Sequence, residues 1–193
     1  ILATVNIDSD GIEINKSQGQ TDEGTYSITL KEVTIDSANI QSKDCGTALQ
    51  HSFLLCAVAK SAEMAGAAER CLAYATENVM TRKQFGKPLA ELQAVQHQAA
   101  DMFTAIQIGN LLLDDAINHI DSGKPFGGQA RVCKSWMNDA CFKASAVSHQ
   151  LMGGTGYMLE TDLHLFTLHI LRNRPDFGSS DHHRKHIAID LGL

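Results

Sequence analysis

The strongest constraint on the fold of this chain is a change in the spacing of its apolar residues at about residue 47. Before that point apolar and polar side chains alternate, and after it apolar side chains recur every three or four residues. Alternation is typical of half-buried strands, whereas the longer step is typical of amphipathic helices. The sequence therefore predicts a β-rich segment over residues 1–41 and a helical-bundle domain over residues 42–193.

Residues 1–41 carry the pattern of a few short antiparallel strands. One alternating stretch runs from Ile1 to Ile7, a turn follows at Asp8–Gly11, and a second stretch covers Ile12–Ile14. A loop rich in Gly, Gln and Asp leads to a third stretch at Tyr26–Leu30. Three short strands make a poor independent domain. We therefore expect this segment to need more sheet, from a longer chain or from a neighbouring molecule.

The rest of the chain predicts three long helices. The first runs from about Thr47 to Thr81 and is rich in Ala, whose small side chain lets helices approach closely. The second ends at the polar run 121–125, and the third stops at Gly153–Gly154. Their apolar residues form bundle seams: Leu92, Val95, Ala99, Met102, Ile106, Leu113, Ile117 and Ile120 in the second, and Val132, Trp136, Ala140, Ala144, Val147 and Leu151 in the third.

Two shorter helical stretches complete the pattern. A broken helix covers about Glu160 to Leu171, Pro175 and Gly178 interrupt the chain, and a last short helix begins near Asp181. The predicted fold class is mainly α, an up-and-down helical bundle preceded by a few antiparallel strands.

Composition and charge exclude several functions. Hydrophobic residues make up 44% of the chain, enough for a packed core. No apolar run reaches the roughly 18 residues that span a bilayer, so we expect no membrane insertion. The formal net charge of −6 argues against nucleic-acid binding. The chain begins with Ile1 and shows no signal-peptide pattern, so we expect a cytoplasmic protein and a piece of a longer or processed product.

The cysteines do not form a recognisable framework. Their number is odd, no two have the CxxC spacing, and most lie in apolar surroundings. We expect reduced, buried thiols of an intracellular protein, and neither a disulfide frame nor a metal site.

The segment Arg82–Pro88 lies between the first two long helices. Positive charge at a helix C-terminus is favoured by the helix dipole, so this segment has an ordinary interpretation as a helix corner with a capping cation. Its functional interpretation is an anion site, because a guanidinium offers paired donors that suit a pyrophosphate.

The segment Gln150–Tyr157 contains three glycines within four positions, Gly153, Gly154 and Gly156. Glycines let a backbone turn sharply and approach a ligand closely. The segment ends a helix instead of following a strand, so it is not a dinucleotide-binding fingerprint. Alone, it is explained equally by a simple helix stop.

Histidines gather in the last predicted helix. His182 and His186 are four residues apart and share a helix face, which a metal site would require. No HExxH-type carboxylate motif accompanies them, so we interpret His182, His183 and His186 as solvated surface residues. No Ser/His/Asp or Cys/His set has the spacing of a known nucleophilic site, so we propose no nucleophile.

Taken together, these segments resemble the acyl-CoA dehydrogenase family. Arg82-x-Gln84-Phe85-Gly86, followed by Gln93 and Ala100-Asp101-Met102, resembles one block of the family. Gln150 to Tyr157, followed by Glu160, resembles a second block, and the two occur in order at the family's separation. Residues 30–39 resemble the end of the family's middle β-domain, so residues 1–41 would be a remnant of that domain.

The resemblance implies an activity and a cofactor. Family members are oxidoreductases of fatty acid metabolism that oxidise the Cα–Cβ bond of an acyl-CoA with FAD. Their flavin spans a dimer interface, and a partner's bundle holds its pyrophosphate half. The implied FAD-binding residues of this chain are Arg82, Gln84, Phe85, Gln93, Gln150, Gly153, Gly154 and Ser179. We expect Arg82 and the Gln150–Gly154 turn to lie close together, and we expect a homodimer or tetramer that acts on acyl-CoA.

The resemblance fails at the catalytic base. In the family this base is usually the Glu of a Tyr-Glu-Gly-Thr segment, and counting without gaps from Tyr157 puts Phe177 at the Glu position. A subset of the family places its Glu in the first bundle helix, where counting back from Gly66 gives Cys56. Neither residue is a carboxylate base. Two carboxylates lie near these positions in sequence, Asp176 beside Phe177 and Glu63 after Cys56, and Asp176 is the alternative base. A shift of one residue along a helix turns a side chain by about 100°, which argues against a simple replacement.

Three functions follow from this pattern. The first is a dehydrogenase that uses an unrecognised base. The second is a non-catalytic partner subunit that completes an FAD site, as in bacterial steroid-degrading members built from one active and one degenerate subunit. The third is a flavin-free helical oligomerisation fragment. We expect weak or absent FAD binding by this chain alone, because most of the β-domain that shelters the flavin ring is not part of it.

Overall fold

The computed structural model describes residues 1–17, 25–42 and 44–193, which divide into two compact units, Ile1–Ser52 and Phe53–Leu193. The loop rich in Gly, Gln and Asp lies in residues 18–24, outside the described residues. In the described part, no helix combines the length and the apolar character that crossing a membrane requires.

The first unit contains two small antiparallel pairs. Strand β2 (Ile12–Ser17) pairs with β3 (Thr25–Leu30), and β1 (Leu2–Ala3) pairs with β4 (Ile40–Ser42). A short 3₁₀ helix, η1 (Ser37–Asn39), precedes β4.

The prediction of a strand through Ile7 was wrong, because β1 ends at Ala3. Asn6 begins a turn instead: its carbonyl accepts from the Ser9 amide and its side chain accepts from the Asp8 amide. Such local side-chain bonds compete with a strand ladder.

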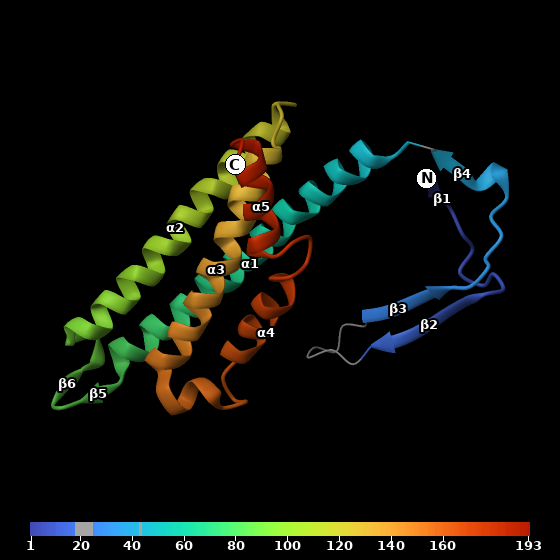
Figure 1. Cartoon of the computed structure of the whole chain (residues 1–193). Coiled ribbons are helices and arrows are strands. Elements are labelled where there is room, and N and C mark those ends of the chain that lie inside the picture. Colours follow the sequence, from blue (N-terminus) through green and yellow to red (C-terminus); the bar gives the residue numbers. More distant parts are fainter. Residues whose placement is uncertain (18–24, 43) are drawn as a thin grey trace. The chain divides into compact units, whose positions relative to one another are not determined.

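The second unit is an up-and-down bundle (Figure 1). Its long helices are α1 (Gly46–Thr81, whose first turns lie in the first unit), α2 (Gln93–Asp121) and α3 (Gly127–Met152). A tight hairpin of β5 (Lys83–Gln84) and β6 (Lys87–Pro88), then η2 (Leu89–Glu91), joins α1 to α2. After α3 come η3 (Gly153–Tyr157), α4 (Leu163–Asn173) and α5 (Ser180–Asp190). The mainly α fold class and the predicted order of helices are confirmed.

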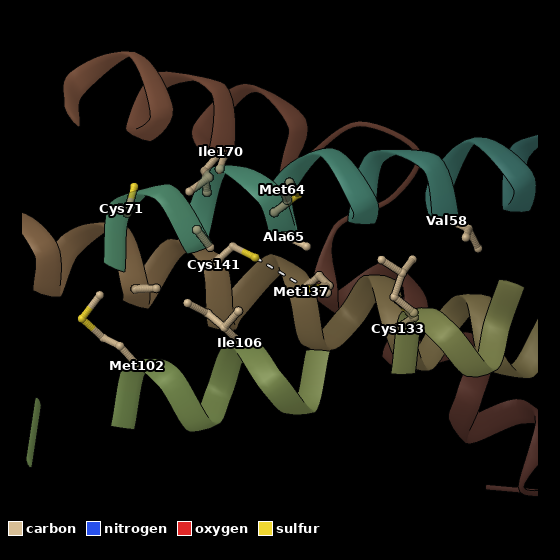
Figure 2. Close-up of a cluster of buried hydrophobic side chains, with 14 of the residues drawn as sticks. Val58, Met64, Ala65, Cys71, Met102, Ile106, Cys133, Met137, Cys141 and Ile170 are labelled. Carbon is tan, nitrogen blue, oxygen red and sulfur yellow. Dashed lines mark hydrogen bonds between the residues drawn. The ribbon is translucent and has the colours of Figure 1, made fainter. Parts of the chain in front are cut away.

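Helix α3 is central, because it packs against α2, α4 and α5. Figure 2 shows the core between α1, α2 and α3, where Met64, Ile106 and Met137 are essentially fully buried. Two residues predicted for the α3 seam are partly exposed, Val132 at 40% and Trp136 at 38%. Ala144 and Leu151 are buried, as predicted. Cys133, Met137 and Cys141 are buried as well, and the prediction omitted them.

Candidate functional site

The structure places Arg82 beside the glycine turn that ends α3. The Arg82 Nη1 donates to the Met152 carbonyl at 3.4 Å, and a side chain on Gly153 would lie 3.8 Å from the same nitrogen. One turn earlier on α1, the Asn78 amide donates to the Leu151 carbonyl at 3.2 Å. These two carbonyls are among the last of α3, which lack partners inside the helix. The C-terminal end of α1 therefore caps the C-terminus of α3.

The three glycines of this turn differ in whether backbone conformation or packing requires a glycine. Gly153 has a φ of +62°, a backbone conformation that favours glycine. Gly156 is buried, and a Cβ there would lie 3.0 Å from the Cβ of Met152. A Cβ on Gly154 would meet nothing within 4 Å, so the backbone beside Arg82 faces open space. An exposed guanidinium and an uncovered backbone turn make an arrangement suited to an anion.

The other predicted ligands on this end of the bundle are exposed. Gln84 and Phe85 lie on the β5–β6 hairpin, where Phe85 is 87% exposed and has a φ of +55°. Gln93 is the first residue of α2, and Gln150 lies in the last turn of α3. Both Gln side chains are exposed.

Ser179 lies away from this group. It is the N-cap of α5, where its hydroxyl accepts from the His182 amide. Its neighbour Ser180 donates to Asp139 of α3. Asp139 precedes Gly153 by fourteen residues, which is about 20 Å along a helix axis. Within one chain, Ser179 and Arg82 therefore lie in separate parts of the bundle.

The two positions that the sequence analysis predicts for the family's catalytic base lie in one neighbourhood. Phe177 packs edge-on against Phe53, with ring centroids 5.7 Å apart, and Phe53 precedes Cys56 by one helical turn on α1. Phe177 has a φ of +52° and is half-buried. The alternative base Asp176 lies near enough to Lys134 to raise the pKa of that amine.

Lys134 fixes this corner from inside the bundle, and sequence analysis did not find it. It is fully buried, and its Nζ donates to Asn138 Oδ1 at 2.7 Å and to the Asn173 carbonyl at 2.8 Å. Asn138 in turn donates to the Gly178 carbonyl at 3.1 Å. Burial lowers the pKa of Lys134 to about 8, although the nearby Asp176 opposes this. The available signal was a lysine and an asparagine four residues apart on an otherwise buried helix face.

The prediction of solvated histidines was wrong for His183. Its side chain is fully buried, and its Nε2 donates to the Phe177 carbonyl at 2.9 Å. Burial lowers the pKa of His183 to about 4, so the ring is neutral at pH 7. His182 is exposed, as predicted. The sequence placed α5 at the surface, whereas α5 packs one face against α3.

All five cysteines are free thiols, as predicted, and all are buried except the half-buried Cys56. Burial raises the pKa of Cys71 and of Cys141 to about 12. In the described part of the chain, no group of three His, Cys, Asp or Glu residues has a metal-binding arrangement.

The chain matches one known family over most of its length. The model of the acyl-CoA dehydrogenase C-terminal domain matches residues 47–191. The chain belongs to the acyl-CoA dehydrogenase family. Its segments at Arg82 and Gly153 thus lie within the family's C-terminal domain.

Two relatives and one solved structure illustrate the relationship. Mitochondrial isobutyryl-CoA dehydrogenase of Dictyostelium discoideum is 37% identical over 94 residues, covering 48% of this chain and 23% of the relative. Acyl-CoA dehydrogenase IpdE2 of Mycobacterium tuberculosis is 34% identical over 110 residues, covering 57% of this chain and 33% of the relative. The structure of PigA with FAD and proline has a TM-score of 0.91 at 22% identity, over 98% of this chain and 51% of PigA. The chain thus matches about a quarter to a third of the length of the two relatives and about half of the length of PigA.

Proposed function

We propose that this chain forms the C-terminal part of an acyl-CoA dehydrogenase-like flavoprotein and lacks a catalytic base of its own. Acyl-CoA dehydrogenase chemistry and FAD belong to the family. The observation that supports the proposal for this chain is the contact between Arg82 and the Met152–Gly153 turn.

The residues at this turn fit a diphosphate. Arg82 is exposed and makes one side-chain hydrogen bond among the described residues, so the fork of its guanidinium can still bind an anion. Gly154 leaves its backbone uncovered, and Gln84, Gln93 and Gln150 add exposed amides at the same end of the bundle. When bound, FAD supplies the acceptor for a hydride from the acyl β-carbon. The chain's own residues bind and orient its diphosphate half.

The chemistry of proton removal is where the chain differs. Phe177 and Cys56 occupy the family's base positions, and the Phe177 ring packs against Phe53. This packing favours the second candidate function, a non-catalytic subunit that completes an FAD site and stabilises a homodimer, a tetramer or an assembly with a catalytic partner. Family members act on acyl-CoA and form oligomers, and for this chain the acyl-CoA partner and the cytoplasmic location are part of the proposal.

The visible spectrum of the whole flavoprotein, of which this chain would be the C-terminal part, tests the proposal, because we expect weak or absent FAD binding by this chain alone. A flavin band that butyryl-CoA and octanoyl-CoA do not bleach supports a flavoprotein without its own base. Bleaching by either ester would show that a base is present and would refute that part of the proposal.

The Arg82 contact is tested by FAD binding. Arg82→Gln should weaken FAD binding about tenfold or more, because a charge-assisted hydrogen bond contributes about 1.5–3 kcal/mol. Lys83→Gln is the matched control, since it removes an exposed cation one residue away. Equal FAD affinity in both variants would contradict the assignment of the diphosphate to Arg82.

A further inference from the structure

A second polar cluster lies between α1 and α4, away from the turn at Arg82. The Glu63 carboxylate accepts from Lys60 Nζ at 2.9 and 3.1 Å and from Asn173 Nδ2 at 3.0 Å. The His169 Nε2 lies 3.4 Å from the same carboxylate and 2.9 Å from Asn173 Nδ2. Three charged or titratable side chains and one amide thus converge on one point of the bundle surface.

This cluster is more than a surface ion pair, because its anchor is buried. Asn173 is fully buried, and its carbonyl accepts from the buried Lys134. Its side-chain Nδ2 therefore holds Glu63 and His169 in one arrangement. The hydrogen bonds from Lys60 and Asn173 outweigh the effect of partial burial and lower the pKa of Glu63, so the carboxylate is charged at neutral pH.

The cluster lies at an open groove of about 460 Å³. Small residues of α1 and larger apolar residues of α4 form most of its walls, namely Ala62, Gly66, Ala67, Leu165 and Phe166. Glu63 and His169 add the polar groups. The side chains of Glu63 and His169 are 41% and 40% exposed, so a ligand in the groove can reach both. The groove suits an apolar group that carries one polar atom.

The position along α1 connects this groove with the proposed reaction. Cys56, Lys60 and Glu63 follow one another at i, i+4 and i+7, which places them within about 60° of one helix face. Cys56 is a family position for the base, so the reacting carbons of an acyl group would lie near it. Glu63 lies seven residues farther, about 10 Å along the helix. An acyl chain that extends from Cys56 toward the C-terminal end of α1 would reach Lys60 and Glu63 with its distal part.

We propose that Glu63 and His169, held in place by Lys60 and the buried Asn173, form a subsite for the distal part of the acyl group, selective for an acyl-CoA that carries a hydroxyl there. This inference rests on the proposed acyl-CoA function and names its substrate class. A hydroxyl both donates and accepts. The Lys60 ammonium carries three N–H donors and makes two hydrogen bonds to Glu63, so one donor remains for the hydroxyl oxygen. The Glu63 carboxylate can accept a hydrogen bond from the hydroxyl group. A wholly apolar chain would displace water from the Lys60–Glu63 pair without offering a hydrogen bond in its place.

A matched pair of esters tests the subsite. The probes are 8-hydroxyoctanoyl-CoA and nonanoyl-CoA, in which a methyl group replaces the hydroxyl, and the measurement is isothermal titration calorimetry of the full chain. We expect about tenfold tighter binding of the hydroxylated ester. Lys60→Met, which keeps the aliphatic stem, and Glu63→Gln should each bring the ratio of affinities near one. Glu69→Gln, an exposed carboxylate on the same helix that bonds to Asn110, should leave the ratio unchanged.

Three results would overturn the subsite: equal affinities in the unsubstituted protein, a preference that survives both Lys60→Met and Glu63→Gln, or no binding of either ester. FAD binding, followed separately by flavin absorbance, distinguishes the two proposals. If FAD and nonanoyl-CoA bind without a preference for the hydroxyl, only the subsite fails. If neither FAD nor an ester binds to the whole flavoprotein that carries this chain, the flavoprotein assignment fails with it.

Discussion

The buried His183 makes the bundle sensitive to mild acid. Its Nε2 donates to the Phe177 carbonyl, and its Nδ1 is buried with no hydrogen-bond partner in the described part of the chain. Besides burial, the charges near it are His182, Lys134 and Arg131, all of which oppose a second proton. The structure therefore accommodates the neutral ring and disfavours the imidazolium.

The sign and size of the effect follow from linkage. The pKa of His183 is about 4 in the folded chain, against an ordinary value of 6.5 in the unfolded chain, so between these values the unfolded chain binds a proton that the folded chain does not. Stability must then fall as the pH falls. From pH 7 to pH 5 this single residue should reduce the free energy of unfolding by about 2 kcal/mol.

Urea denaturation at pH 7 and pH 5, followed by circular dichroism, measures this loss. In His183→Gln the amide can still donate to the Phe177 carbonyl but does not titrate, so about 2 kcal/mol of the pH-dependent loss should disappear. His97→Gln, an exposed histidine of α2, should retain the full loss. If His183→Gln and the unsubstituted protein lose the same stability between the two pH values, the buried neutral histidine is not the cause.

Two further substitutions test the packing of α3. Gly109→Ala should destabilise the bundle by about 1–3 kcal/mol in thermal melts, because the new Cβ would lie 2.7 Å from the Sδ of the buried Met137. Lys134→Met should cost about 2 kcal/mol or more at pH 7, since it leaves buried acceptors on Asn138 and Asn173 without a donor. Above pH 8 this deficit should widen, because the native lysine, whose pKa is about 8, no longer carries a buried charge there.

The helices were predictable because local signals and the global fold agree. Gly153, with its positive φ, ends α3 where the glycine pattern placed the stop, and Thr81 is the last residue of α1, as predicted. The first strand was not predictable from alternation alone. There, the hydrogen bonds that the Asn6 side chain and carbonyl accept decided the backbone against the apolar pattern of Ile1 to Ile7.

The site was predictable in part, and the limit is physical. The contact between Arg82 and the glycine turn was predictable, because both segments belong to sequence blocks that resemble the family. The buried pair Lys134 and Asn138 has no such signature, because a lysine inside a bundle is recognised only once three acceptors surround it. His183 escaped for the same reason: burial of one face of α5 depends on tertiary packing, which a short polar helix does not reveal.

Phe177, at the position predicted for the family's base, takes part in the packing of the α4–α5 corner. The Phe177 ring contacts Phe53, the Phe177 carbonyl accepts from His183, and Gly178 has no room for a Cβ, which would lie 2.6 Å from His183 Nε2. A glutamate at position 177 would bring its carboxylate to the Phe53 ring and to a histidine whose neutral form is favoured. Restoring a base there would therefore require repacking of the whole corner. Under the proposed function, proton removal is therefore expected from a catalytic partner and not from this corner.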